Sequence, residues 1–214
     1  MNIKAVFFDY GQVICHPQDP ATIDRIAELA GVERKKFEPV LWALRDDYDL
    51  GRITAKEYYI KILSSLGAGI DVKKIDAMIE TDLASWKSIN NGTVALMEEI
   101  KKAGYTLGIL SNMPEDFLAW ARKTLPVFSL PHIGIFSCEV SHVKPDKAIY
   151  EEMLSALNTK SNEPAFNQTA FSEIVFFDDK EENVKSARDL GIDAFLWKDP
   201  ENARQELLSL GLKL

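Results

Sequence analysis

Cysteine is scarce in this sequence, with only Cys15 and Cys138 among 214 residues. Two cysteines give no disulfide framework, and their spacing matches no zinc site. No apolar run approaches the ~20 residues that a membrane-spanning helix needs. The N-terminus also lacks a basic region followed by an apolar signal segment. From these absences we expect a cytoplasmic protein that does not bind membranes.

Positive charge is the second scarcity. The chain has 25 Lys and Arg against 33 Asp and Glu, a formal net charge of −8, which argues against nucleic acid as a partner. The same charge repels phosphate esters at long range, so a phosphate site would need local positive charge from a cation and a lysine. Hydrophobic residues are not scarce. At 46% of 214 residues they can form one substantial core, or a core with a smaller inserted domain.

Polar side chains follow three apolar, strand-like runs: Asp9 after 3–8, Ser111 and Asn112 after 106–110, and Asp178 and Asp179 after 174–177. In an open α/β sheet, ligands bind at the carboxyl ends of the strands, so these side chains are candidates for one shared site. Lys144, followed by a proline, lies between the second and third runs. Each motif alone also fits a simpler explanation: a polar strand end, a helix N-cap or a solvated lysine.

Strand and helix patterns alternate from about residue 90, which predicts a parallel sheet with helices on both faces. The expected strands are 105–110, 133–138, 173–177 and 193–197, and the expected helices 93–103, 114–124, 146–157, 181–190 and one from 199. Residues 158–172 are polar and aperiodic, so we expect a loop there. Four helical patterns without a strand precede this region, at about 20–30, 34–46, 54–66 and 71–83. Their short connections predict a small antiparallel bundle.

The order of these four motifs resembles the haloacid dehalogenase superfamily of phosphatases and phosphotransferases, over nearly the whole chain. The resemblance implies an α/β fold with a three-layer, Rossmann-like core, formed by residues 1–15 and 89–214. It also implies a four-helix cap over residues 16–88, inserted just after the first motif. The expected activity is hydrolysis of a small phosphate monoester, by a monomer or a homodimer.

By the same resemblance, Asp9 is the nucleophile that forms an aspartyl-phosphate. A carboxylate suits this role because it is ionised at neutral pH and needs no activating base. Ser111 and Asn112 match the second motif and would hold phosphoryl oxygens. Lys144 matches the third, where its ammonium would bind both the nucleophile and the phosphate.

Attack by a carboxylate on a dianionic phosphate is opposed by charge, so the resemblance implies Mg²⁺ as a cofactor. Hard oxygen ligands suit this ion, and we expect Asp9, the carbonyl of Gly11 and Asp178 to hold it. Asp179 and Asn183 are expected to support the site from beside it.

Gly11 departs from the usual pattern. Most phosphatases of this family carry a second Asp here, which protonates the leaving oxygen and then activates water. The Asp-x-Gly-x-Val form resembles that of bacterial glucose-1-phosphate phosphatases, and an anomeric hydroxyl leaves more easily without an acid. We therefore expect a sugar phosphate as substrate, with His16 as the nearest titratable residue that could replace the acid.

Two alternatives stay open on the sequence. The 2-haloacid dehalogenases also lack the second Asp and use no metal, although they resemble Asp-x-Tyr-Gly, whereas Tyr10 here follows Asp9 directly. A catalytically weak scaffold with a binding or regulatory role is the other alternative. In either enzyme, cap residues would select the substrate, and aromatic and guanidinium groups suit sugars and anions. The candidates are Trp42, Tyr48, Arg52 and Trp86.

Overall fold

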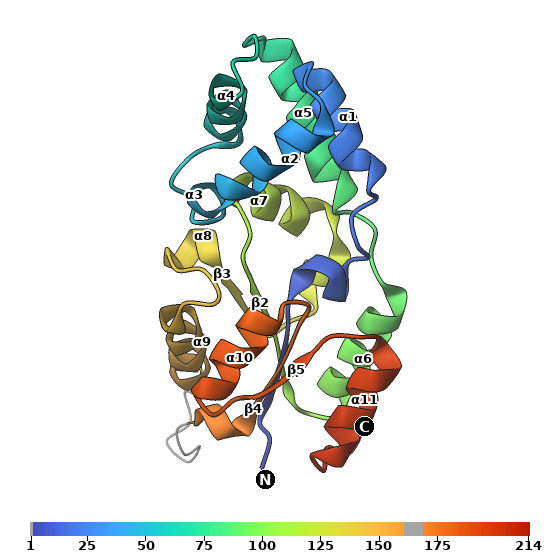
Figure 1. Cartoon of the computed structure of the whole chain (residues 1–214). Helices are drawn as coiled ribbons and strands as arrows, with labels where there is room; N and C mark the ends of the chain where they lie inside the picture. The colour runs from blue at the N-terminus through green and yellow to red at the C-terminus, as the bar shows by residue number, and fades with distance from the viewer. Residues whose placement is uncertain (1, 161–168) are drawn as a thin grey trace.

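The computed structural model describes residues 2–160 and 169–214, and its centre is a five-stranded parallel sheet in the order β3-β2-β1-β4-β5. The strands are β1 (Ala5–Phe8), β2 (Thr106–Ser111), β3 (Ile133–Phe136), β4 (Ile174–Asp178) and β5 (Asp193–Leu196). β1 is the middle strand and pairs in parallel with β2 on one side and β4 on the other. The predicted parallel α/β sheet is therefore confirmed, and Figure 1 shows it in the lower part of the molecule.

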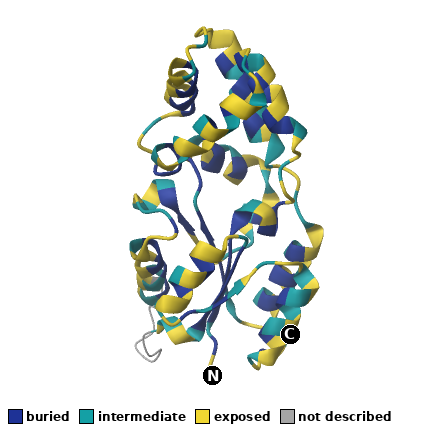
Figure 2. Cartoon of the chain, in the orientation of Figure 1, coloured by how far each residue is buried: buried dark blue, intermediate teal, exposed yellow. Residues whose placement is uncertain are grey.

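Both faces of the sheet are buried, because successive side chains of a strand point to opposite faces. Val6 and Phe8 pack into one hydrophobic cluster, with residues of helices α6 (Asn91–Lys102), α7 (Glu115–Thr124) and α11 (Pro200–Ser209). Ala5 and Phe7 pack into a second cluster with α9 (Lys147–Lys160) and α10 (Glu181–Asp189). Two cores on two faces give the three layers, and the strands appear as the buried centre in Figure 2.

Helices α1–α5 form a separate layer beyond the carboxyl ends of the strands (Figure 1). They are α1 (Ala21–Ala30), α2 (Arg34–Ala43), α3 (Arg45–Asp49), α4 (Ala55–Ser65) and α5 (Val72–Ser85). This cap has its own hydrophobic cluster, whose largest buried side chains include Phe37, Tyr58 and Tyr59. α4 begins with a capping box at Thr54, whose hydroxyl accepts from the backbone N–H of Glu57.

The prediction of one helix over 34–46 was wrong, because the backbone leaves helical geometry at Leu44 (φ −102°, ψ 4°). The break separates α2 from α3 and lets α3 contact α8 (Ser137–Val140) of the core. The expected strand 133–138 likewise ends two residues early, since α8 begins at Ser137.

The chain leaves the core and returns to it through two adjacent segments. Cys15 and Ile89 form an isolated antiparallel bridge, and the His16 backbone N–H donates to the Ser88 carbonyl at 2.7 Å. The division of the chain at residues 16 and 88 stays a prediction, with these contacts lying beside it.

Of the loop expected over 158–172, residues 161–168 lie outside the described part of the chain. Within the described ranges, no helix is long and apolar enough to cross a membrane.

Candidate active site

The sheet brings the polar strand ends together. Asp9 follows the middle strand β1, and its backbone N–H donates to the Phe177 carbonyl of β4 at 2.9 Å. Ser111 ends β2 and Asp178 ends β4, which are the two neighbours of β1. The first, second and fourth sequence motifs therefore meet at one edge, as the strand pattern predicted.

Lys144 lies at the centre of this cluster. Its ammonium is 2.8 Å from Asp9 Oδ1 and 2.6 Å from Asp178 Oδ2, and it donates to the Leu110 carbonyl at 2.9 Å. The side chains of Lys144 and Asp178 are only 2% and 0% exposed. Burial works to lower the pKa of Lys144, but Asp178 and Asp9 outweigh it and raise this pKa, so the ammonium stays charged.

Three carboxylates crowd around this one lysine. Oxygens of Asp9, Asp178 and Asp179 all lie within 4.8 Å of one another. Burial raises the pKa of Asp9, with Lys144 opposing the shift and Asp178 adding to it. Burial, together with Asp9 and Asp178, also raises the pKa of Asp179, to about 7. A cluster of hard oxygen donors with more negative than positive charge fits a divalent cation such as Mg²⁺.

Asp178 is held by groups at the start of α10. Its Oδ1 accepts from the Asn183 amide at 2.9 Å and from the Lys180 backbone N–H at 2.8 Å. The N-cap of α10 is Lys180, and that of α7 is Pro114. The simpler explanation of the second and fourth motifs as helix N-caps is therefore wrong.

Asn112 fixes the backbone of Lys144. Its Oδ1 accepts from the Lys144 backbone N–H at 2.7 Å, and its Nδ2 donates to the Lys144 carbonyl at 2.9 Å. Ser111 is buried, at 2% exposure, and lines the same cavity. Asn112 thus both lines the cavity and positions Lys144. The spacing of the two residues along the chain does not predict this contact.

The turn after β1 adds a residue that the sequence analysis missed. Gln12 has φ +58°, the left-handed region that non-glycine residues seldom adopt. Its amide donates to Asp179 Oδ2 at 2.6 Å. At Gly11, by contrast, φ is −62°, and a Cβ atom would meet only Asp9 Oδ2 and a Trp86 ring carbon, each at 3.8 Å. Gly11 is therefore required neither by backbone strain nor by lack of space.

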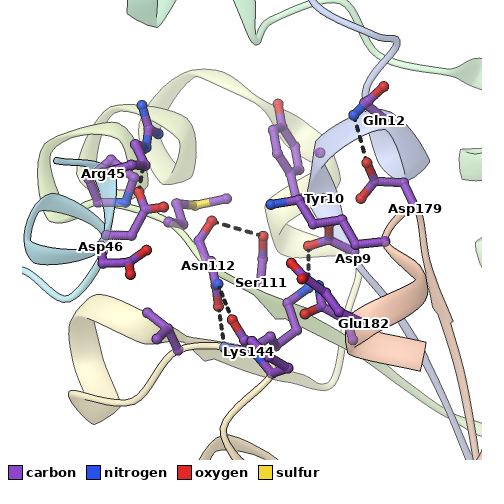
Figure 3. Close-up of a pocket in the computed structure, with 18 of the residues that line it drawn as sticks. Asp9, Tyr10, Gln12, Arg45, Asp46, Ser111, Asn112, Lys144, Asp179 and Glu182 are labelled. Carbon is purple, nitrogen blue, oxygen red and sulfur yellow. Dashed lines mark hydrogen bonds and ion pairs between the residues drawn. The ribbon is translucent and has the colours of Figure 1, made fainter. Parts of the chain in front are cut away.

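A cavity of about 600 Å³ opens between the cap and these residues (Figure 3). The cap side contributes Trp42, Arg45, Asp46, Asp49 and Trp86. Two of the four proposed selectivity residues, Trp42 and Trp86, are thus at the cavity.

The other two candidates, Tyr48 and Arg52, are not among the described residues that line this cavity. Tyr48 is buried and stacks on Tyr58, with ring centroids 4.6 Å apart, while Arg52 pairs with Asp47 on the surface. His16, the candidate replacement acid, is exposed and is also not among those lining residues. Arg45 and Asp46 were missed because nothing in their local pattern separates them from ordinary charged helix residues.

Residues 3–191 match the family model described as haloacid dehalogenase-like hydrolase. The chain belongs to this family of hydrolases. Bifunctional epoxide hydrolase 2 of Mus musculus is 30% identical over 230 residues, which cover 97% of this chain and 38% of that protein. The chain spans between 21% and 38% of the length of the first curated relatives that it matches.

Solved structures of the family share the fold. A HAD family enzyme from Bacteroides thetaiotaomicron, in a magnesium complex, superposes with a TM-score of 0.73 at 22% identity, covering 93% of this chain and 95% of that one. A HAD-like hydrolase from Porphyromonas gingivalis gives a TM-score of 0.74 at 20% identity, with both chains covered completely. The likeness to the haloacid dehalogenase superfamily noted in the sequence is confirmed.

Proposed function

We propose that this hydrolase is a Mg²⁺-dependent phosphatase of small phosphate monoesters, sugar phosphates in particular, acting through an aspartyl-phosphate on Asp9. The observation that carries the proposal is the Lys144 ammonium, buried between Asp9 and Asp178 at 2.8 and 2.6 Å. Clustered buried charges cost free energy unless they are paired. A cluster that still holds three carboxylates around one lysine is suited to a cation and an anionic substrate.

Asp9, the Gly11 carbonyl and Asp178 are the proposed metal ligands, with Asp179 and Asn183 in support. Mg²⁺ bound there supplies positive charge that offsets the repulsion between Asp9 and a dianionic phosphate. The structurally similar HAD family enzyme from Bacteroides thetaiotaomicron has been crystallised with magnesium and inorganic phosphate. This supports the choice of Mg²⁺ as the ion and of a phosphate as the ligand class.

In the first step, an Asp9 carboxylate oxygen forms a bond to phosphorus while the bond from phosphorus to the leaving oxygen breaks. Lys144 and Ser111 bind the phosphoryl oxygens and hold the group in line. The leaving oxygen takes its proton from water, since Gly11 has no side chain to supply one. That proton transfer leaves a hydroxide ion. In the second step, the oxygen of a water molecule bonds to phosphorus while the Asp9–phosphorus linkage breaks, and one proton of this water passes to the hydroxide. Hydrogen phosphate leaves, and the Asp9 carboxylate is restored.

The absence of an acid at Gly11 sets the expected substrate. When no acid protonates the leaving oxygen, the rate of cleavage falls least for a leaving group whose hydroxyl is already acidic, such as an anomeric sugar hydroxyl. Sugar 1-phosphates are therefore the proposed substrates, ahead of esters of ordinary alcohols.

Phosphate release from sugar phosphates and p-nitrophenyl phosphate, with Mg²⁺ and with EDTA, tests the proposal. We expect metal-dependent turnover in the wild type and a loss of at least about 10³-fold in Asp9→Asn, with cooperative unfolding retained. Asp189→Asn is the matched control, because Asp189 is exposed and pairs only with Lys185 among the described residues. No phosphate release from any ester, with or without metal, would disprove the phosphatase.

In the 2-haloacid dehalogenase alternative, the same aspartate attacks the carbon that carries the halogen instead of a phosphorus. Chloride release from 2-chloropropionate, measured in EDTA, distinguishes it, because that reaction needs no metal. The three clustered carboxylates favour the phosphatase. Partner binding that survives Asp9→Asn, without any turnover in the wild type, would indicate the scaffold instead.

A further inference from the structure

Outside the catalytic cluster, the cavity lining carries more negative than positive charge. Its charged residues there are Arg45, Asp46, Asp49, Asp146, Lys180 and Glu182. Two cations thus face four carboxylates. In the proposed reaction the phosphate is held by Lys144 and a metal, so these other lining residues are left to contact the leaving group.

Arg45 is the only basic residue that the described cap contributes to the cavity, and its charge is already offset. Its Nε is 2.8 Å from Asp49 Oδ1, and its Nη1 is 3.7 Å from Asp82 Oδ2. Its guanidinium also lies over the Tyr48 ring, 5.1 Å from the centroid. With two carboxylates and an aromatic face around it, Arg45 has little charge left to attract a second anionic group on a substrate.

Asp46, one residue along, differs from Arg45. It is exposed and lines the cavity, and in the described chain its carboxylate has neither an ion pair nor a hydrogen bond to a protein group. Trp42, four residues earlier, also lines the cavity and is 45% exposed, unusual for so large a hydrophobic side chain. Figure 3 shows Asp46 on the cap side, with Ser111 and Lys144 on the core side.

A carboxylate and an exposed indole that line one cavity suit a polyol. The carboxylate accepts hydrogen bonds from two neighbouring hydroxyls, while the indole covers the apolar C–H face of a sugar ring. A cationic leaving group fits less well because Lys180 also lines the cavity and, in the described chain, forms no ion pair that would offset its charge. The volume of about 600 Å³ lies in the usual range for small-molecule sites.

We propose that Asp46 and Trp42 are specificity-determining residues that select an uncharged polyol as the leaving group and disfavour one that carries a second anion. The proposal rests on the phosphatase function proposed above. It adds the chemical class of the leaving group, the part of the substrate that is esterified to the phosphate. Its substrate class is a phosphate monoester of a neutral hexose.

The test compares kcat/KM on glucose 1-phosphate, glucuronic acid 1-phosphate, glucosamine 1-phosphate and p-nitrophenyl phosphate. Each charged sugar differs from glucose by one group, a carboxylate in glucuronic acid and an ammonium in glucosamine. We expect the wild type to prefer glucose 1-phosphate over both charged sugars by about tenfold or more. Asp46→Ala should lower kcat/KM on glucose 1-phosphate about tenfold more than on p-nitrophenyl phosphate, and so should Trp42→Ala. Asp46→Lys should narrow the preference against the anionic sugar by about tenfold.

Asp47→Ala is the matched control, because Asp47 pairs with Arg52 at 3.2 Å and is not among the described cavity residues. It should leave all four kcat/KM values within about twofold. Equal turnover of the anionic and neutral sugars, a preference for the amino sugar, or an equal loss on every substrate in Asp46→Ala would each overturn the proposal. Failure of the phosphatase itself is distinguishable, since the wild type would then release no phosphate even from p-nitrophenyl phosphate.

Discussion

Tyr48 of the cap donates its hydroxyl to the carboxylate of Asp116 in α7, 2.8 and 2.9 Å from the two oxygens. Beside this contact, Ser137 of the core donates to the Asp49 carbonyl at 2.5 Å. Burial and the nearby Asp116 raise the pKa of Tyr48, so its hydroxyl stays protonated. These two bonds join α3 to the core next to the cavity, and they hold the cap in the position that completes the site.

We expect Tyr48→Phe to weaken this attachment and lower kcat/KM on p-nitrophenyl phosphate about tenfold, because a hydrogen bond to a charged group is lost. The variant should still unfold cooperatively. Tyr105→Phe is the control and should keep its activity, since the Tyr105 hydroxyl in the core accepts, among the described residues, only a surface bond from the Lys213 backbone N–H. Equal kcat/KM in both variants would show that the Tyr48 bond does not matter for catalysis.

Lys144→Met should destabilise the fold by about 3–5 kcal/mol at neutral pH, because Asp9 and Asp178 lose their buried counter-charge. Burial already raises the pKa of Asp9 above its unfolded value, so protonation favours the folded state. The stability deficit should therefore shrink as the pH falls from 8 towards 5. Urea unfolding at several pH values measures this, with Lys185→Met as an exposed control. A deficit that does not change with pH would contradict the explanation.

Mg²⁺ should stabilise the wild type, because the proposed site, the cluster of Asp9, Asp178 and Asp179, is assembled only when the chain is folded. At a concentration of about 100 times Kd the gain is about 2.7 kcal/mol, which is a rise of roughly 5–10 °C in Tm for a chain of this size. Thermal unfolding in MgCl2, against NaCl of equal ionic strength, measures it. Asp179→Asn should at least halve the shift, whereas Asp189→Asn should keep it. An equal shift in NaCl would rule out specific binding.

Gly11→Asp should add the missing general acid. A Cβ at this position contacts its nearest neighbours only at 3.8 Å, and the backbone is at φ −62°, so the backbone accepts a side chain here without strain. We expect kcat on glucose 6-phosphate, an ordinary alcohol ester, to rise about 10-fold or more, with a smaller rise on glucose 1-phosphate. Gly11→Asn has the same size but no acid and should show no such rise. A similar gain in both variants would attribute the effect to shape rather than to proton transfer.

The sequence by itself determined the architecture of the core. Alternating patterns predicted the parallel sheet, and apolar runs ending in Asp9, Ser111 and Asp178 predicted that these residues share one edge. Such predictions succeed because the periods of strands and helices are local, and because parallel strands place all their carboxyl ends on the same side. The break at Leu44 was not predictable in this way, since the residues of α2 and α3 together keep a helical pattern, whereas the contact of α3 with α8 is made between elements far apart in the sequence.

The tertiary structure decided which charges meet. The local pattern around Lys144 fits a solvated lysine, and only the family resemblance predicted that its ammonium binds Asp9. Packing buries Lys144 between two carboxylates and fixes its backbone through Asn112, 32 residues away. Packing also determines which cap residues line the cavity. It places Asp46 there and Tyr48 in the contact between cap and core. The physical reason is that a strand or helix forms from nearby residues, whereas the neighbours of a charge depend on how distant elements pack, which no local period records.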